Sequence, residues 1–258
     1  MPNTPCGSAL YLWSDAALYV GGDLSPAMHR HNAVECAVAL DGPFRVQSED
    51  GVETKVTGAV LVDANVLHRV SSPGHAVAFL YLEKTAFAVE PAPDGISALR
   101  APVGEALRDR LNEARKGKLG NADTNSVRAE ILSLFAAHIP SGPPRDPRIE
   151  AVLAHIAAHP GAQPRGAELA DIAGLSPGRL QHLFKAHVGM PVRRYLLWFR
   201  IRRVIEILHD GADLTRAAHE AGFSDSAHFS RTFKAMVGIP PSEIFGRRSP
   251  ARITLCNR

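Results

Sequence analysis

The chain has 258 residues, of which 45% are apolar and 21% charged, an ordinary balance for a globular protein that excludes global disorder. It has no run of 18 apolar residues, and no basic stretch followed by an apolar one at its N-terminus, so neither a membrane span nor a secretory signal is predicted. Cys6, Cys36 and Cys256 form no CxxC pair. This argues against a disulfide scaffold and fits a reducing cytoplasm.

The net charge of +3 is unevenly distributed. Residues 1–144 carry −4 and residues 145–258 carry +7. The sign changes at Pro140–Pro147, which has four prolines and a glycine in eight residues and cannot continue a helix. A basic half indicates a polyanion partner, although arginines that merely solvate a helical surface would give the same balance. The predicted division is one domain over 1–140, a linker over 141–148 and a second domain over 149–248.

The first domain is predicted to be built of short strands. Alternating or apolar segments of strand length occur over 35–40, 44–48, 52–56, 58–62 and 75–82. Asp50-Gly51 between two of them is a strong hairpin signal. Strands at this spacing favour a small antiparallel β-barrel.

Two amphipathic helices follow the strands. One carries an apolar stripe from Val103 to Ala114, and the other carries a stripe from Val127 to His138. These helices would either cover the barrel or present one stripe to a second copy of the chain, which makes a homodimer a candidate.

The second domain contains an internal repeat. Phe184–Pro191 recurs 49 residues later as Phe233–Pro240, with six of eight identities. Upstream, the pattern Ala170–Ser176 recurs as Ala218–Ser224. Two copies at this spacing indicate a duplicated supersecondary unit.

Each copy predicts two short helices joined at a glycine, Gly174 or Gly222, with small alanines where the helices cross. The second helices are expected over 177–188 and 226–237. Their apolar residues are Leu180, Leu183, Phe184, Phe229 and Phe233. This is the pattern of a helix-turn-helix, whose second helix enters the major groove of DNA.

A long helix is predicted to join the two copies, from Val192 to about His209. It would span about 28 Å, close to the ~34 Å turn of DNA. Five arginines lie along it: Arg193, Arg194, Arg200, Arg202 and Arg203.

Residues 149–246 resemble the DNA-binding domain of AraC/XylS-type transcriptional regulators. The most specific stretches are Ala221–Lys234 and Gly238–Glu243. The resemblance implies two helix-turn-helix units, binding to promoter DNA, and an N-terminal domain for sensing and dimerisation. It places the protein in the cytoplasm, associated with the nucleoid, with RNA polymerase as a partner if the protein is an activator.

The position of each residue on the second helices indicates which side chains would contact DNA. Arginine and glutamine suit bidentate contacts to guanine and adenine, and lysine suits phosphate. The predicted DNA-binding residues are Arg179, Gln181, His182, Lys185, Ser226, His228, Arg231 and Lys234.

The first domain also carries a histidine cluster. His29, His31 and Glu35 have the spacing of the first cupin motif, and His68 resembles the histidine of the second, although Asp63 and Asn65 replace the expected proline and glycine. Three imidazoles and a carboxylate suit Zn, Ni or Fe. A structural role, or a small organic effector, would explain the same residues. Cys36 would lie on the opposite face of the strand from Glu35.

The predicted fold is therefore α+β with two domains: an antiparallel, cupin-like β-barrel plus helices, then an all-α domain with two helix-turn-helix units. The predicted function is sequence-specific regulation of transcription under the control of an effector bound in the barrel, with no catalytic residues. The alternative is a metal-dependent cupin enzyme fused to a DNA-binding module.

Overall fold

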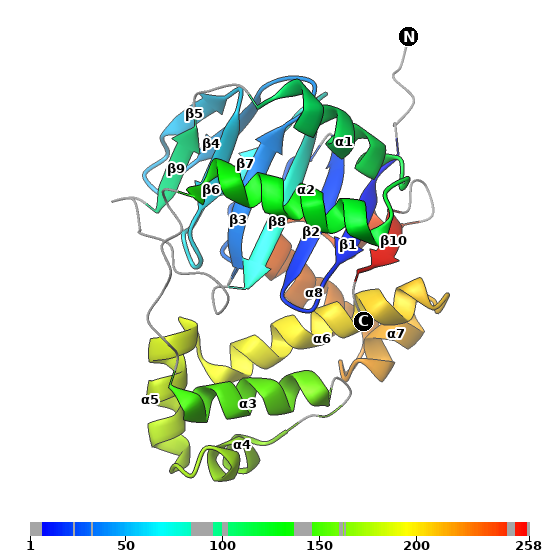
Figure 1. The fold of residues 1–258 in the computed structure, drawn as a ribbon. Coiled ribbons are helices and arrows are strands. Elements are labelled where there is room, and N and C mark those ends of the chain that lie inside the picture. Colours follow the sequence, from blue (N-terminus) through cyan, green and yellow to red (C-terminus); the bar gives the residue numbers. More distant parts are fainter. Residues whose placement is uncertain are drawn as a thin grey trace. The chain divides into compact units, whose positions relative to one another are not determined.

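The computed structural model of the chain describes residues 7–22, 24–31, 33–83, 95–99, 103–136, 146–159, 162, 164–246 and 251–256 (Figure 1). Cys6, His138 and most of the predicted linker lie outside these residues. The chain divides into two compact units: the first contains residues 1–140 and 233–258, and the second contains residues 141–232. The division falls within helix α8 (Ser226–Val237).

The described strands of the first unit form two sheets. One has the order β10-β1-β2-β8-β3-β6-β9, and the other has the order β5-β4-β7. The strands are β1 (Ala9–Leu12), β2 (Ala16–Gly22), β3 (Ala33–Ala39), β4 (Phe44–Gln47), β5 (Glu53–Val56), β6 (Ala59–Val62), β7 (Arg69–Ser71), β8 (Ala76–Glu83), β9 (Ile96–Leu99) and β10 (Arg252–Leu255).

The strands predicted over 35–62 and 75–82 form as β3 to β6 and β8, but the expected antiparallel barrel needs correction. The larger sheet ends on β9 at one edge and on β10 at the other, so the described strands do not close into a ring. The β10 strand comes from the C-terminal end of the chain and pairs in parallel with β1, from Ala9 beside Arg252 to Leu12 beside Leu255. No strand was predicted for these last residues.

The larger sheet is buried on one face by two helices, α1 (Glu105–Arg115) and α2 (Asn121–Leu134), which lie across it in Figure 1. Alternate residues of the central strands point to this face, because successive side chains of a strand alternate between its two sides. On β3 these residues are Val34, Cys36 and Val38, which join the core formed with the two helices.

The apolar stripe of α2 packs against the larger sheet of the same chain. Val127, Ile131 and Phe135 are fully buried in the same core as the sheet residues. Of the two interpretations of this stripe, covering of the sheet is therefore confirmed, and the buried side chains of the stripe are not available to a second copy.

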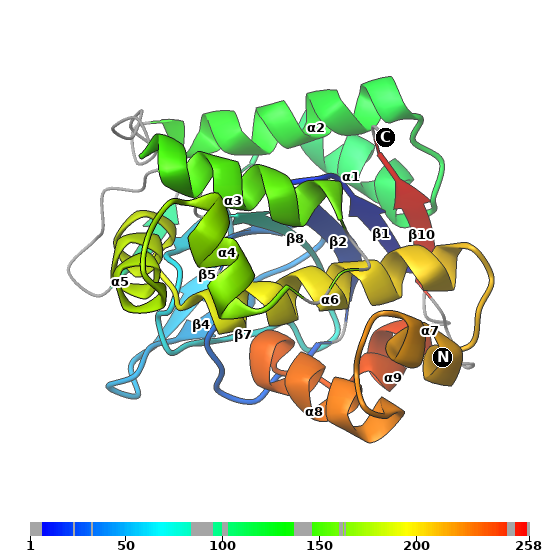
Figure 2. The ribbon, with the colours of Figure 1, turned by 90° about the horizontal axis from the view of Figure 1, so that it is seen from below.

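The second unit contains α3 (Pro147–Ala158), α4 (Gly166–Ile172), α5 (Pro177–Val188), α6 (Val192–His209) and α7 (Leu214–Glu220), and it also contains the start of α8. The helices predicted over 177–188, 192–209 and 226–237 are confirmed with the same bounds. Figure 2 shows α3, α4 and α5 gathered at one end of the long α6, with α7 at the other. The short helix α9 (Pro241–Phe245) follows α8 and belongs to the first unit.

A compact core holds α3, α4, α5 and the start of α6 together. Leu169, Ala170 and Ala173 of α4 pack with Leu180 and Phe184 of α5. The small side chains at the crossing allow the two short helices to approach closely. No helix within the described ranges is both long and apolar enough to cross a bilayer.

We expect Phe184→Ala to lower the free energy of unfolding of the second unit by about 3 to 5 kcal/mol, because the ring is fully buried beside Tyr195, at 5.5 Å between ring centroids. Ile172→Ala on α4 is the control: its side chain is exposed, so its effect should stay below about 1 kcal/mol. Urea denaturation followed by circular dichroism measures both. An equal effect of the two substitutions would contradict this packing.

Candidate functional site

The turn between α4 and α5 is closed by two backbone hydrogen bonds. The N–H of Gly174 donates to the carbonyl of Asp171 at 3.0 Å, and the N–H of Leu175 donates to Ala170 at 2.9 Å. Gly174 has φ +62°, a left-handed conformation that glycine adopts without a steric penalty.

The turn between α7 and α8 repeats this arrangement. The N–H of Gly222 donates to His219 at 2.9 Å, the N–H of Phe223 donates to Ala218 at 3.0 Å, and Gly222 has φ +85°. Because the same two bonds form around equivalent alanines and glycines, the sequence repeat is also a repeat of backbone geometry.

The second helix of each pair begins at a side-chain cap. Ser176 Oγ accepts a hydrogen bond from the N–H of Arg179 at 3.4 Å, and Asp225 Oδ1 accepts one from the N–H of His228 at 2.6 Å. The hydrogen bond from the His228 N–H, followed by the one from the Ser224 hydroxyl, lowers the pKa of Asp225. The aspartate, rather than Ser224, therefore caps the second copy.

The predicted DNA-binding residues differ in exposure. Arg179, Gln181, His182 and Lys185 are exposed on α5, and Arg231 and Lys234 are exposed on α8. Ser226 and His228 are half-buried. The His228 ring lies 5.3 Å from the Phe223 ring between centroids, and its Nδ1 lies 3.1 Å from Ser224 Oγ.

The arginines of α6 do not form one uniform basic face. Arg193 is exposed, whereas Arg202 is buried, with its guanidinium carbon 5.7 Å from the centroid of the Phe199 ring. Arg203 forms an ion pair with Glu206 at 2.9 Å. Of these, only Arg193 presents an exposed side chain to a polyanion.

The histidine cluster lies at the edge of a cavity in the first unit. Glu35 on β3 lines this cavity, whereas its neighbour Cys36 faces the opposite side and packs in the helix-covered core. Burial in that core raises the pKa of the Cys36 thiol. The predicted opposition of these two side chains is confirmed, and it follows from the alternation of the strand.

Backbone hydrogen bonds hold His29 and His68 side by side. The N–H of His29 donates to the His68 carbonyl at 3.0 Å, and the N–H of His68 donates to the His29 carbonyl at 3.1 Å. The N–H of Asn65 donates to the His31 carbonyl at 2.8 Å. Asn65 has φ +68°, so the asparagine adopts the left-handed conformation for which a glycine was expected; asparagine tolerates it better than most residues.

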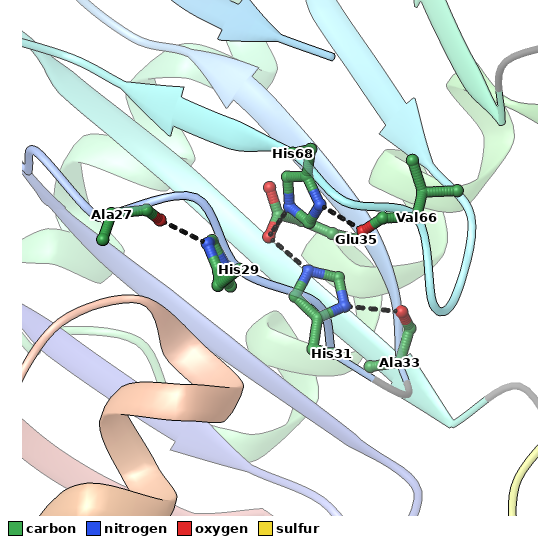
Figure 3. Close-up of polar contacts among 7 residues, drawn as sticks. All are labelled: Ala27, His29, His31, Ala33, Glu35, Val66 and His68. Atoms are coloured by element: carbon green, nitrogen blue, oxygen red, sulfur yellow. Dashed lines mark hydrogen bonds and ion pairs between the residues drawn. The ribbon is translucent and has the colours of Figure 1, made fainter. Parts of the chain in front are cut away.

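Each of the three imidazoles is oriented by a backbone carbonyl (Figure 3). The Nδ1 atoms of His29, His31 and His68 lie 3.0, 2.8 and 3.0 Å from the carbonyl oxygens of Ala27, Ala33 and Val66. A carbonyl only accepts hydrogen bonds, so each Nδ1 carries the proton and each Nε2 is directed at the cluster.

The Nε2 atoms converge on the Glu35 carboxylate. Glu35 Oε2 lies 2.9 Å from His31 Nε2 and 3.6 Å from His68 Nε2. The Glu35 side chain is 1% exposed. Burial opposes its charge, but the contacts with His31 and His68 outweigh burial and lower its pKa.

Burial and the charge of Glu35 shift the pKa values of the neighbouring ionisable groups. Burial lowers the pKa of His29 to about 4, aided by the other two imidazoles, so its ring is neutral at neutral pH. Burial opposes protonation of His68, but Glu35 raises its pKa overall. Burial, and then the Glu35 charge, raise the pKa of Tyr81 well above its ordinary value, which keeps the phenol neutral.

The residues fit a metal ion. The four ligand atoms of His29, His31, Glu35 and His68 lie within 4.8 Å of one another, and ligands around one ion at about 2.0 to 2.2 Å would need only small further movements. Nδ1–H bonds to backbone carbonyls are the usual support of metal-bound histidines.

The cavity itself is small, with a volume of about 30 Å³, and is mostly apolar. Its lining includes Tyr19, Phe79 and Tyr81 from the sheet face opposite to α1 and α2, and Val237, Ile239 and Ile244 from the chain that ends α8 and follows it. The sequence prediction missed both sets. Alternation along residues 75–82 puts Phe79 and Tyr81 on one face, but only the register of β8 with β3 places that face beside Glu35. Local sequence gives no signal for the second set.

The C-terminal region is similar to known proteins. Residues 169–247 match a family model described as a helix-turn-helix domain. The chain is 31% identical over 100 residues to the transcriptional activator RhaS of an Enterobacter species, covering 38% of this chain and 36% of that protein. It is 31% identical over 108 residues to the arabinose operon regulatory protein of Escherichia coli, covering 39% and 35%. The matched region thus spans about a third of the length of these relatives.

A solved structure is similar over most of the chain. It is that of ToxT from Vibrio cholerae bound to an unsaturated fatty acid, with a TM-score of 0.58, 12% identity, and coverage of 89% of this chain and 94% of that one. The likeness shows a shared fold, with a sheet-rich N-terminal region and a helical C-terminal region. The duplicated helical unit and the matched residues show that the C-terminal region is a helix-turn-helix domain similar to that of AraC-like transcriptional regulators.

Proposed function

We propose that the protein is a sequence-specific regulator of transcription that binds promoter DNA through two helix-turn-helix units, α4 with α5 and α7 with α8. The observation that carries the proposal is the repeated turn at Gly174 and Gly222 within residues that match a helix-turn-helix family. A helix pair with this turn presents its second helix to a major groove.

The exposed residues of α5 and α8 would perform different tasks. Arg179, Gln181, His182 and Arg231 would contact base edges, and Lys185 and Lys234 would contact phosphates. Ser226 and His228 contribute less surface in this proposal because they are half-buried. The +7 charge of residues 145–258 favours the approach of DNA.

The proposed linker separates two domains with different functions. Residues 149–248 bind DNA, residues 141–148 connect, and residues 1–140 form a cupin-like domain that binds an effector and pairs two copies of the chain in the cytoplasm. The cavity beside Glu35 is the proposed effector site, since a largely apolar cavity with a few polar groups is typical of ligand sites. If the protein is an activator, RNA polymerase is its further partner.

The buried cluster is also the observation that favours the alternative, a metal-dependent cupin enzyme fused to a DNA-binding module. We propose regulation in preference because the residues that match known proteins are those of the helical repeat of regulators. Turnover of a substrate by the metal-loaded protein, abolished in His31→Ala, would reverse this preference.

Genome-wide mapping of the binding sites of the tagged full-length protein tests the proposal. We expect discrete sites at promoters that share one sequence motif, and this motif then supplies the operator for measurements in solution. Binding without a shared motif would contradict sequence-specific regulation.

We expect Arg231→Ala to weaken binding to this operator by about 1 to 3 kcal/mol and to relax the preference at one base position, because a bidentate contact to a base is lost. Competition against a library of operator variants measures both effects. Arg148→Ala on α3 is the control: this exposed arginine pairs with Asp146 outside the matched region and should leave the base preference unchanged. An unaltered preference in the Arg231 variant would remove it from the base contacts.

We expect Lys234→Ala to weaken binding to all DNA sequences and to reduce the slope of log affinity against log salt by about one unit, as expected for one lost phosphate contact. Fluorescence anisotropy at several salt concentrations measures the slope. Lys55→Ala, an exposed site on β5, is the matched control and should keep the wild-type slope. Equal slopes in the two variants would exclude Lys234 from the phosphate contacts.

A further inference from the structure

The chain that ends α8 and follows it forms one wall of the cavity beside the histidine cluster. We name residues 237–246 the post-α8 segment. Its residues Val237, Ile239 and Ile244 line the cavity together with His29 and Glu35. The segment directly continues a proposed recognition helix, so the effector cavity and the end of that helix share side chains.

Gly238 and His29 make a close approach that joins the segment to the cluster. The N–H of Ala27 donates to the Gly238 carbonyl at 3.1 Å, and the Ala27 carbonyl accepts from His29 Nδ1 at 3.0 Å. A Cβ on Gly238 would lie 2.7 Å from His29 Nδ1 and 2.7 Å from Pro26 Cβ. The glycine is therefore required both by its φ of +82° and by the imidazole beside it.

Three buried polar atoms of the cluster are left without a hydrogen bond in the part of the chain that the structure describes. His29 Nε2, Glu35 Oε1 and His68 Nε2 are buried and have no hydrogen-bond partner among the described residues. All three are acceptors when Nδ1 carries the ring proton. The contact of His31 Nε2 with Glu35 Oε2, at 2.9 Å, likewise needs a proton or a cation between the two atoms. Buried acceptors that face one another are stabilised by a cation and repel a carboxylate.

We infer that His29, His31, Glu35 and His68 bind one divalent transition-metal ion, and that the ion orders the post-α8 segment through the contact of His29 with Gly238. Imidazole and carboxylate ligands suit Zn, Ni and Fe, as the sequence indicated. A bound ion fixes His29, which fixes Ala27 and the carbonyl of Gly238. This inference rests on the proposed function only in its last step, in which the order of the segment alters the affinity for DNA.

Titration of the metal-free, full-length protein with Co²⁺, followed by its visible absorption bands, tests the site. We expect about one ion per chain, and at least about tenfold weaker binding in Glu35→Gln, which keeps the size of the side chain and removes its charge. If this variant fails to fold, His29→Gln replaces it. Wild-type protein that binds no stoichiometric Co²⁺ would overturn the inference.

A matched control addresses adventitious binding. His155 on α3 and His159, which directly follows this helix, have ring centroids 4.4 Å apart, and such a surface pair collects metal ions weakly. The double variant His155→Ala with His159→Ala should keep the stoichiometric ion. Loss of the ion in this variant, with full binding in Glu35→Gln, would mean a surface site only and would overturn the inference.

Hydrogen exchange tests the coupling without DNA. We expect Co²⁺ to slow amide exchange in residues 238–246 by about tenfold or more, because a restrained segment opens less often. Gly238→Ala should weaken Co²⁺ binding by about tenfold, although it changes no ligand. Gly211→Ala is its control: it has a similar φ of +91° but no atom within 4 Å of its added Cβ, so Co²⁺ binding should stay at the wild-type level. Exchange unaltered by Co²⁺, or equal binding in the two glycine variants, would overturn the coupling.

The last step is measured separately with the mapped operator. If the ion changes the affinity for DNA by some factor, DNA must change the affinity for the ion by the same factor, because the two binding equilibria are linked. Equal operator affinity with and without Co²⁺ would overturn this step alone. Failure to find an operator would overturn the proposed function and leave the metal site and its coupling to the segment standing.

Discussion

The buried charge of Glu35 is the constraint on which the N-terminal site depends. An ionised carboxylate at 1% exposure is costly unless charged or hydrogen-bonding partners surround it. The carboxylate cannot face the other side of the sheet, because shifting the register of β3 by one residue would place Cys36 in the cavity and Glu35 in the apolar core. The imidazoles are therefore the required partners of one charge, and the backbone bonds between His29 and His68 hold the two loops that supply them.

The helical repeat has the same internal bonds in both copies and different surroundings. Gly189 and Gly238 end the second helices with φ of +79° and +82°, and each donates to the carbonyl four residues earlier. After Gly189 the chain enters the core formed by α3, α4 and α5, with Met190 and Val192 buried there. After Gly238 it meets His29 and the cavity. The chain that follows each helix pair therefore has different surroundings, although the two pairs share their internal bonds.

Local signals were enough to predict most elements. Helix bounds at 177–188, 192–209 and 226–237 follow from capping residues, prolines and apolar spacing, and β3 to β6 follow from alternation and the turn at Gly51. The same signals place Glu35 opposite to Cys36. They do not predict β10, because four residues at the end of the chain become a strand only by pairing with β1. They also do not predict the wall made by residues 237–246, because its neighbours lie about two hundred positions earlier in the chain.

The charge of Glu35 restricts the ligands that can enter the cavity beside it. A second carboxylate in this cavity would lie beside the buried charge of Glu35 and would be repelled by it. The same site offers a cation three imidazole nitrogens and a carboxylate oxygen as ligands. The polar residues of β3 and of the loops beside it, rather than the sheet that carries them, therefore favour a cation over an anion at this site.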